Sequence, residues 1–129
     1  MKSIVRALLV LLALASVSSI ADQALQYEPS VVEVSGKIAK GKFQHPNGEW
    51  AGYYSLKLVT PVSINADGAN PMNVSESEIK QIQLYSNSPE IRQQLNKLSE
   101  KDATVKGTLF HSHTAWHVRP LVMNVLEVK

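Results

Sequence analysis

The sequence contains no cysteine among its 129 residues. Disulfide bonds, cysteine nucleophiles and attachment of a lipid to an N-terminal cysteine are therefore excluded. The sequence also lacks a Gly-x-Ser-x-Gly nucleophile elbow and a glycine-rich phosphate-binding loop. These absences leave no complete catalytic signature, and they favour a binding protein over an enzyme.

The first 21 residues have the pattern of a cleavable signal peptide. Lys2 and Arg6 precede an apolar run over residues 7–17, and Ser19-Ile20-Ala21 supplies small residues at the positions that a signal peptidase reads. The alternative is a membrane anchor, but a spanning helix needs about 20 apolar residues, and serines shorten this run. We expect export to the periplasm, with no transmembrane anchor after cleavage.

Cleavage would change the charge balance of the chain. Of 13 basic and 11 acidic residues, Lys2 and Arg6 lie in the predicted signal peptide, so 11 of each sign remain. A neutral domain lacks the basic field that drives binding to a phosphate backbone. Nucleic acid is therefore not expected as a partner. Removing 21 of the 129 residues leaves 108, a size that suits one domain.

Five segments have the alternation of apolar and polar residues that is typical of half-buried strands. They cover residues 31–39, 53–60, 79–86, 103–113 and 117–128. Residues 22–30 show no clear period, and we expect a flexible arm there. The longer polar stretches at 41–52 and 65–77 are predicted to be loops.

A short helix is predicted between the third and fourth strands. Ser88 is a favourable N-cap, Pro89 suits the first helical position, and Ile91, Leu95 and Leu98 form one apolar stripe. Five strands with a helix between strands 3 and 4 indicate an all-β, OB-fold-like Greek-key barrel over residues 31–129. An open antiparallel sheet with a helix across one face is the alternative.

Three of the four histidines lie close together in the sequence, at positions 111, 113 and 117. A three-residue hairpin loop at 114–116 would place His113 opposite His117 and His111 opposite Arg119, with apolar residues facing each other below them. The three imidazoles could then bind zinc or copper, form a hydrogen-bonded structural cluster, or belong to a partner-binding surface. Arg119 argues against a metal, because it would repel a dication.

Aromatic side chains add a second candidate surface. Phe43, Trp50, Tyr53 and Trp116 could line a binding face, since OB-folds often stack ligands on aromatic residues. The alternative is that Tyr53 and Trp50 fill the barrel or pack under the long loop. The candidate binding residues are therefore His111, His113, His117, Arg119, Trp116, Trp50 and Tyr53. No catalytic residue is assigned.

The run Gly107-Thr-Leu-Phe-His-Ser-His-Thr-Ala-Trp-His and the apolar strand after it resemble a small bacterial family of exported proteins of unknown function. The resemblance covers roughly the last 50 residues. It implies export from a bacterial cell and an OB-like barrel, and it implies no established activity.

Three functions stay open at this point. The first is an exported binding module that docks on an envelope or secreted protein, as an inhibitor or immunity-type factor, through its long loops. The second is a periplasmic metal-binding protein that uses the histidines. The third is a cell-envelope hydrolase, for which no pair of acids stands out.

Overall fold

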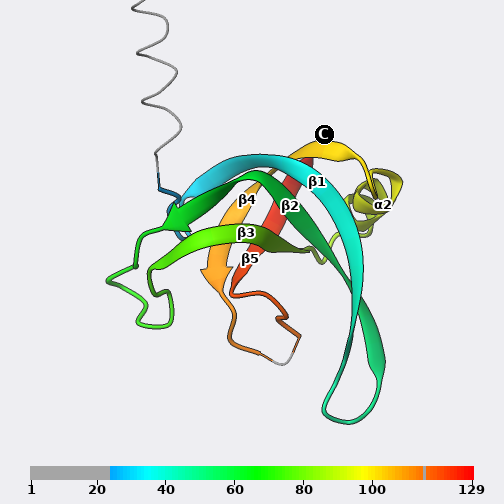
Figure 1. Cartoon of the computed structure of the whole chain (residues 1–129), viewed down its shortest axis with the longest axis horizontal. Coiled ribbons are helices and arrows are strands. Elements are labelled where there is room, and N and C mark those ends of the chain that lie inside the picture. Colours follow the sequence, from blue (N-terminus) through cyan, green and yellow to red (C-terminus); the bar gives the residue numbers. More distant parts are fainter. Residues whose placement is uncertain (1–23, 115) are drawn as a thin grey trace, which may run out of the picture.

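The computed structural model describes residues 24–114 and 116–129, so the predicted signal peptide lies outside the described residues. The elements follow the order β1 (Val31–Gln44), β2 (Trp50–Ile64), β3 (Glu76–Tyr85), α2 (Pro89–Lys97), β4 (Asp102–His111) and β5 (Leu121–Val128). The strands close into one barrel in the order β1-β2-β3-β5-β4 (Figure 1). All described pairs are antiparallel except β3 with β5. This is the five-stranded OB-fold predicted from the sequence, and the open-sheet alternative is wrong because β1 pairs with β4.

β1 closes the barrel because it pairs with two strands along its length. Its first half, Val31–Lys37, pairs with β4, and its second half, from Gly36, pairs with β2. The two pairings overlap at Gly36 and Lys37, and a Cβ atom on Gly36 would collide with the carbonyl group of Lys57. A glycine is therefore required at this close backbone approach.

The long loop predicted at 41–52 is wrong. β1 and β2 stay paired as far as Gln44 and Trp50, which leaves a turn over residues 45–49 with Gly48 at a φ of 91°. The antiparallel backbone hydrogen bonds continue through a stretch that lacks apolar alternation, so periodicity misses them. The resulting hairpin extends well beyond the barrel (Figure 1).

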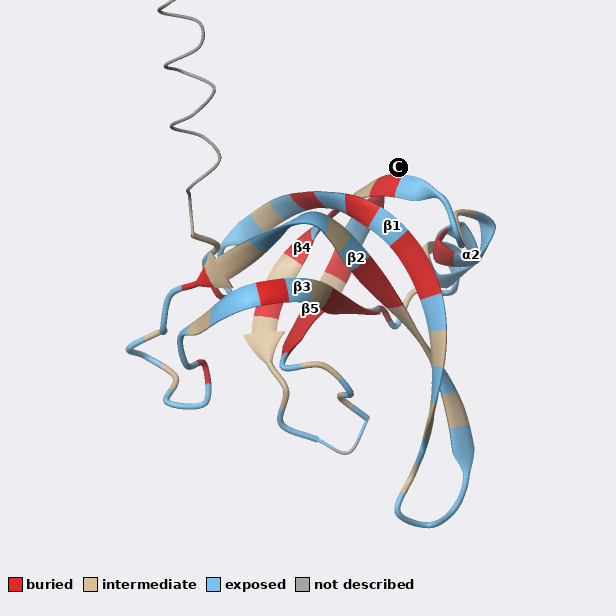
Figure 2. Cartoon of the chain, viewed as in Figure 1, coloured by how far each residue is buried: buried red, intermediate tan, exposed pale blue. Residues whose placement is uncertain are grey.

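The core lies inside the barrel and is formed by the side chains that alternation placed inward. Ile38, Leu56, Ile82, Val105 and Leu109 are fully buried. Figure 2 shows the buried residues along the barrel strands and exposed residues at the hairpin tip. Burial of an aliphatic side chain of this size contributes about 1.5–3 kcal/mol.

The helix is confirmed together with its cap. The Ser88 side chain accepts a hydrogen bond from the Ile91 backbone N–H at 3.3 Å, and Pro89 occupies the first turn. Leu95 is buried in the core, and Ile91 and Leu98 pack against it. The predicted stripe therefore holds the helix against one end of the barrel.

The register predicted for β4 and β5 is wrong. His111 pairs with Leu121 and Leu109 with Met123, so the connection is the loop 112–120 and not a three-residue turn. From Gly107 to His111 the pairs differ from the predicted ones by two residues, and a bulge between Lys106 and Gly107 changes the register again. Because side chains alternate with a period of two, a shift of two keeps apolar residues facing each other, and the sequence pattern does not distinguish the two registers.

The predicted flexible arm is also wrong for residues 24–30. Tyr27 is only 4% exposed and belongs to the core. Its hydroxyl donates to the Val74 carbonyl at 2.6 Å, and the Glu28 backbone N–H donates to the Leu109 carbonyl at 2.8 Å. An aromatic side chain and backbone hydrogen bonds therefore attach this segment to the barrel.

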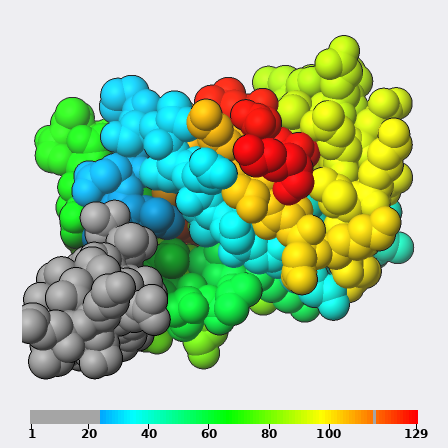
Figure 3. Space-filling model, turned by 90° about the horizontal axis from the view of Figure 1, so that it is seen from above, coloured from blue at the N-terminus to red at the C-terminus, as the bar shows by residue number. Residues whose placement is uncertain are grey.

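The C-terminal end is likewise attached. Thr104 and Lys129 exchange two backbone hydrogen bonds, at 2.8 and 3.0 Å. The view from above shows the C-terminal residues against the neighbouring strands (Figure 3). No helix among the described residues is long and apolar enough to cross a membrane.

Candidate functional site

The β1–β2 hairpin and the loop 112–120 meet beside the barrel through aromatic side chains. The ring centroids of His45 and Trp116 lie 3.6 Å apart, and Phe43 lies 6.0 Å from Tyr53 and 6.2 Å from Trp116. We call Phe43, His45, Tyr53 and Trp116 the aromatic cluster. Trp116 remains 59% exposed, so the cluster presents a large aromatic surface to solvent.

One side chain holds the loop 112–120 on the outside of β3. The amide of Gln83 donates to the Trp116 carbonyl at 3.0 Å and accepts from the backbone N–H groups of Val118 and Arg119, at 2.6 and 3.3 Å. Gln83 is 5% exposed. It satisfies the loop backbone as a neighbouring strand would, and it fixes the position of Trp116.

Arg119 belongs to the same end of the molecule. Its guanidinium lies 3.5 Å from the Tyr53 hydroxyl through Nη2, while its Nε is buried and has no hydrogen-bond partner among the described residues. The same is true of Nε2 of His45. A buried polar atom without a hydrogen-bond partner costs about 1–3 kcal/mol. These two atoms therefore lower the stability of the free protein at this end of the molecule.

His113 and His117 form a separate pair within the loop. Their ring centroids lie 4.8 Å apart, and both pack against Phe110. Nδ1 of His117 accepts from the backbone N–H groups of His113 and Thr114, at 3.1 and 3.3 Å. Partial burial, and then the nearby charge of His113, lower the pKa of His117 below its ordinary 6.5. These contacts use a neutral His117 ring.

His111 has other partners. Its Nε2 lies 3.0 Å from the Glu76 carboxylate, its Nδ1 faces the Ser112 carbonyl at 3.2 Å, and its backbone N–H donates to Asn73 at 3.1 Å. Burial, and then the charge of Glu76, raise the pKa of the Tyr27 hydroxyl nearby. His111 therefore joins β4 to the start of β3.

The three histidines of the predicted metal site do not share one point. His111 is bound to Glu76, whereas His113 and His117 contact each other and Phe110. Across residues 24–114 and 116–129, no three histidine, aspartate or glutamate side chains are placed to hold one metal ion. The predicted placement of the three histidines around one zinc or copper ion depended on the hairpin register, which the structure corrects.

The other predicted binding residues are divided between two places. Tyr53, Trp116 and Arg119 come together at the aromatic cluster. Trp50 begins β2 at the hairpin tip, is 67% exposed and lies outside that cluster. Sequence reasoning missed Gln83, because a buried glutamine in a strand has no distinctive spacing. It also missed the pairing of Glu76 with His111, because the two residues lie 35 positions apart.

A cavity of about 320 Å³ lies beside the aromatic cluster. Tyr53 and Trp116 border it on one side, and Tyr85, Asn87 and Arg92 border it toward α2. It offers aromatic surface, an amide and a guanidinium, which are groups that recognise a ligand by contact and hydrogen bonding.

The fold and this end of the molecule define the class: a five-stranded OB-fold domain with an exposed aromatic surface between its first hairpin and its last loop. Residues 81–129 match a family described as a domain of unknown function (DUF4431). That match covers the same part of the chain as the resemblance noted in the sequence.

No curated protein has a matching sequence. Among solved structures, the chain is similar to one described as Plasmodium falciparum SSB complex with ssDNA. The two are 15% identical, with a TM-score of 0.38 over 83% of this chain and 93% of that one. At this level the likeness assigns no ligand to the present protein.

Proposed function

We propose that this protein is an exported binding module of the bacterial periplasm that docks on another protein, as an inhibitor or an immunity-type factor. The observation that carries the proposal is the aromatic cluster with its exposed Trp116. Aromatic residues and arginine are enriched in the cores of protein interfaces and dominate their binding energy. Tyr53, Trp116 and Arg119 are residues of this kind: Arg119 lies 3.5 Å from the Tyr53 hydroxyl, and Phe43 packs against both Tyr53 and Trp116.

The placement of these residues supports the same proposal. The cluster is formed by a hairpin and a loop that extend from a closed barrel (Figure 1), and loops on a rigid scaffold commonly carry binding. Gln83 fixes the loop 112–120 before any partner arrives. An ordered surface loses less conformational entropy when it binds.

The export part of the proposal depends on residues 1–21. Their basic start, apolar run and small residues before Asp22 are typical of a signal peptide. Cleavage after Ala21 would release a chain with 11 basic and 11 acidic residues. A neutral exported domain is better suited to a protein partner than to nucleic acid.

The two alternatives have less support. Metal binding has no three-ligand arrangement in the described part of the chain. For a hydrolase, the described histidine–carboxylate pair is His111 with Glu76, and the other ring nitrogen faces a backbone carbonyl and not a nucleophilic hydroxyl. Neither arrangement gains a specific observation in its favour.

The test is capture of a partner from the periplasmic fraction of the producing cell by matched variants. The mature protein is compared with Trp116→Ser and with Val59→Ser, which removes an 86% exposed apolar side chain elsewhere. We expect one protein to be retained by the native chain and by Val59→Ser and to be lost with Trp116→Ser. Equal retention by all three proteins would overturn the proposed surface, and a mature N-terminus other than Asp22 would overturn the proposed cleavage.

A further inference from the structure

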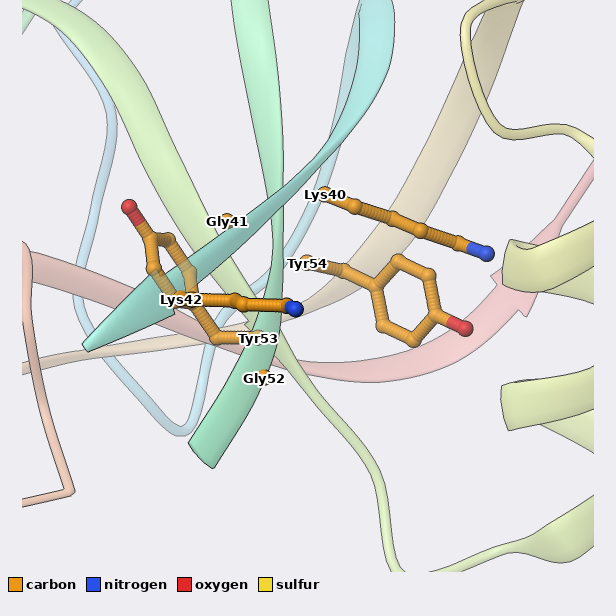
Figure 4. A pocket seen from close by; sticks show the side chains of 6 residues that line it. All are labelled: Lys40, Gly41, Lys42, Gly52, Tyr53 and Tyr54. Atoms are coloured by element: carbon orange, nitrogen blue, oxygen red, sulfur yellow. The ribbon is translucent and has the colours of Figure 1, made fainter. Parts of the chain in front are cut away.

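A groove of about 490 Å³ lies on the β1–β2 hairpin and is lined by Lys40, Gly41, Lys42, Gly52, Tyr53 and Tyr54. Lys40 pairs with Tyr54 and Lys42 with Gly52 across the two strands, so these four side-chain positions share one face. Gly41 and Tyr53 pair on the opposite face, the face of the aromatic cluster. Figure 4 shows the side chains of Lys40, Lys42 and Tyr54 extending to one side while the ring of Tyr53 extends to the other.

Two glycines shape the two faces of the hairpin at this point. A Cβ atom on Gly52 would meet only the Gly41 carbonyl oxygen, at 3.7 Å, so the space above Gly52 is free. A Cβ atom on Gly41 would instead overlap the ring of Tyr53. Gly41 thus lets Tyr53 lie against β1, while Gly52 leaves room beside Lys42.

The groove is positively charged. Lys40 and Lys42 are both exposed, and neither takes part in the ion pairs of the described residues, which join Lys37 to Glu100 and His111 to Glu76. Tyr54 adds a hydroxyl 3.5 Å from Asn96 on α2. Two ammonium groups outside these ion pairs, beside the open space above Gly52, favour an anionic ligand.

We propose that this groove binds an extended acidic segment of the partner protein, with carboxylates on alternate residues. The inference rests on the proposed function in that the partner is a protein. Lys40 and Lys42 are two residues apart on one strand, so their Cα atoms are about 6.6–6.8 Å apart. An extended peptide repeats its side chains on one face at the same interval. A segment lying along β1 therefore brings one carboxylate to each ammonium group.

The peptide is favoured over two other anionic ligands. Affinity for nucleic acid grows with the number of phosphates that are neutralised, and this groove offers two lysines. Stacking of bases or sugar rings needs a free aromatic face. Tyr54 packs against the core, and the ring of Tyr53 extends to the other side of the hairpin, where it packs against Phe43. The spacing of the two lysine positions along β1 is the feature that remains, and it matches the side-chain repeat of an extended chain.

Synthetic peptides test the spacing directly. One peptide carries glutamate at every second position and the other at every third, with the same composition and uncharged residues between. We expect the mature protein to bind the first peptide more tightly in a fluorescence anisotropy titration. The double variant Lys40→Gln, Lys42→Gln should bind it about tenfold more weakly. The matched double variant Lys57→Gln, Lys80→Gln, which removes two exposed lysines from β2 and β3, should bind like the native chain.

A second variant tests the groove without changing charge. Gly52→Val fills the open space above residue 52, so we expect the variant not to bind the peptide. A strand position tolerates valine, so we expect the variant to fold. Equal affinity for the two peptides, or an equal loss in both lysine variants, would overturn the inference. So would tighter binding of oligothymidylate or trigalacturonate than of the alternating peptide. If the alternating peptide does not bind but partner capture still depends on Trp116, the proposed peptide groove is overturned and the proposed function is not.

Discussion

The closed barrel and the end that extends from it differ in how far their side chains are buried and in how completely their polar groups are paired. In the barrel, Leu109 and Ile82 are fully buried aliphatic residues. Glu28 near one end of the described chain and Lys129 at the other are attached to the barrel by backbone hydrogen bonds. At the other end, Trp50 and Trp116 are mostly exposed, and polar atoms of His45 and Arg119 are buried without described partners. The barrel is organised for stability, whereas the extending end keeps features that do not stabilise the free protein.

The same contrast divides three neighbouring histidines. His111 is bound on both ring nitrogens and through its backbone, and it joins two strands. His117, six residues later, accepts hydrogen bonds from the backbone of its own loop and packs against Phe110 at the end of β4. A histidine near the barrel thus has a structural role, and one in the loop affects how the candidate binding surface is presented.

The largest expected effect comes from the barrel. Leu109→Ala removes a fully buried side chain and leaves a cavity, so we expect the free energy of unfolding to fall by about 3 kcal/mol. Urea denaturation of the mature protein measures it. A loss as small as that of a surface substitution would show that the barrel interior is not the stabilising core.

A smaller effect is expected where the two regions meet. Gln83→Leu leaves the Trp116 carbonyl and the Val118 and Arg119 N–H groups without their partner. We expect a loss of about 1 to 2 kcal/mol and faster hydrogen exchange of these two amides. Exchange in β4 should be unchanged, and an unchanged loop would show that Gln83 does not hold it.

His117 should make stability depend weakly on pH. Its pKa is lowered in the folded protein, so its contribution is complete above its unfolded value of 6.5 and is lost as the pH falls through the lower folded pKa. Urea denaturation across this range should show a smaller decline for His117→Asn than for the native chain. An equal decline in both proteins would assign the pH dependence to other groups.

The smallest effect on stability is expected at the most exposed part of the cluster. Trp116→Ser should change the free energy of unfolding by less than about 0.5 kcal/mol, because the side chain is largely exposed already. Thermal denaturation checks this value. A loss comparable with that of Leu109→Ala would mean that Trp116 belongs to the folding core and not to a binding surface.

Local patterns in the sequence were sufficient to predict the barrel. Alternation identified the inward residues Leu56, Ile82 and Leu109, and the Ser88-Pro89 cap located the helix. The register of β4 and β5 was not predictable, because a shift of two residues keeps the same faces together.

The candidate site was predictable only in part. Tyr53, Trp116 and Arg119 were chosen for their chemistry, and the fold brings them together. The contacts of Gln83 with the loop and of Glu76 with His111 join residues more than 30 positions apart. No local pattern encodes such pairs, so they emerge only when the barrel closes.

Docking of a partner at the aromatic cluster is tested most directly by crosslinking in the living cell. A photoreactive phenylalanine analogue replaces Trp116 in one strain and Val59 in another, both on exposed positions. Illumination should join the protein to one periplasmic partner from position 116 and not from position 59. A partner crosslinked from position 59 alone, or from both positions equally, would contradict docking at the aromatic cluster.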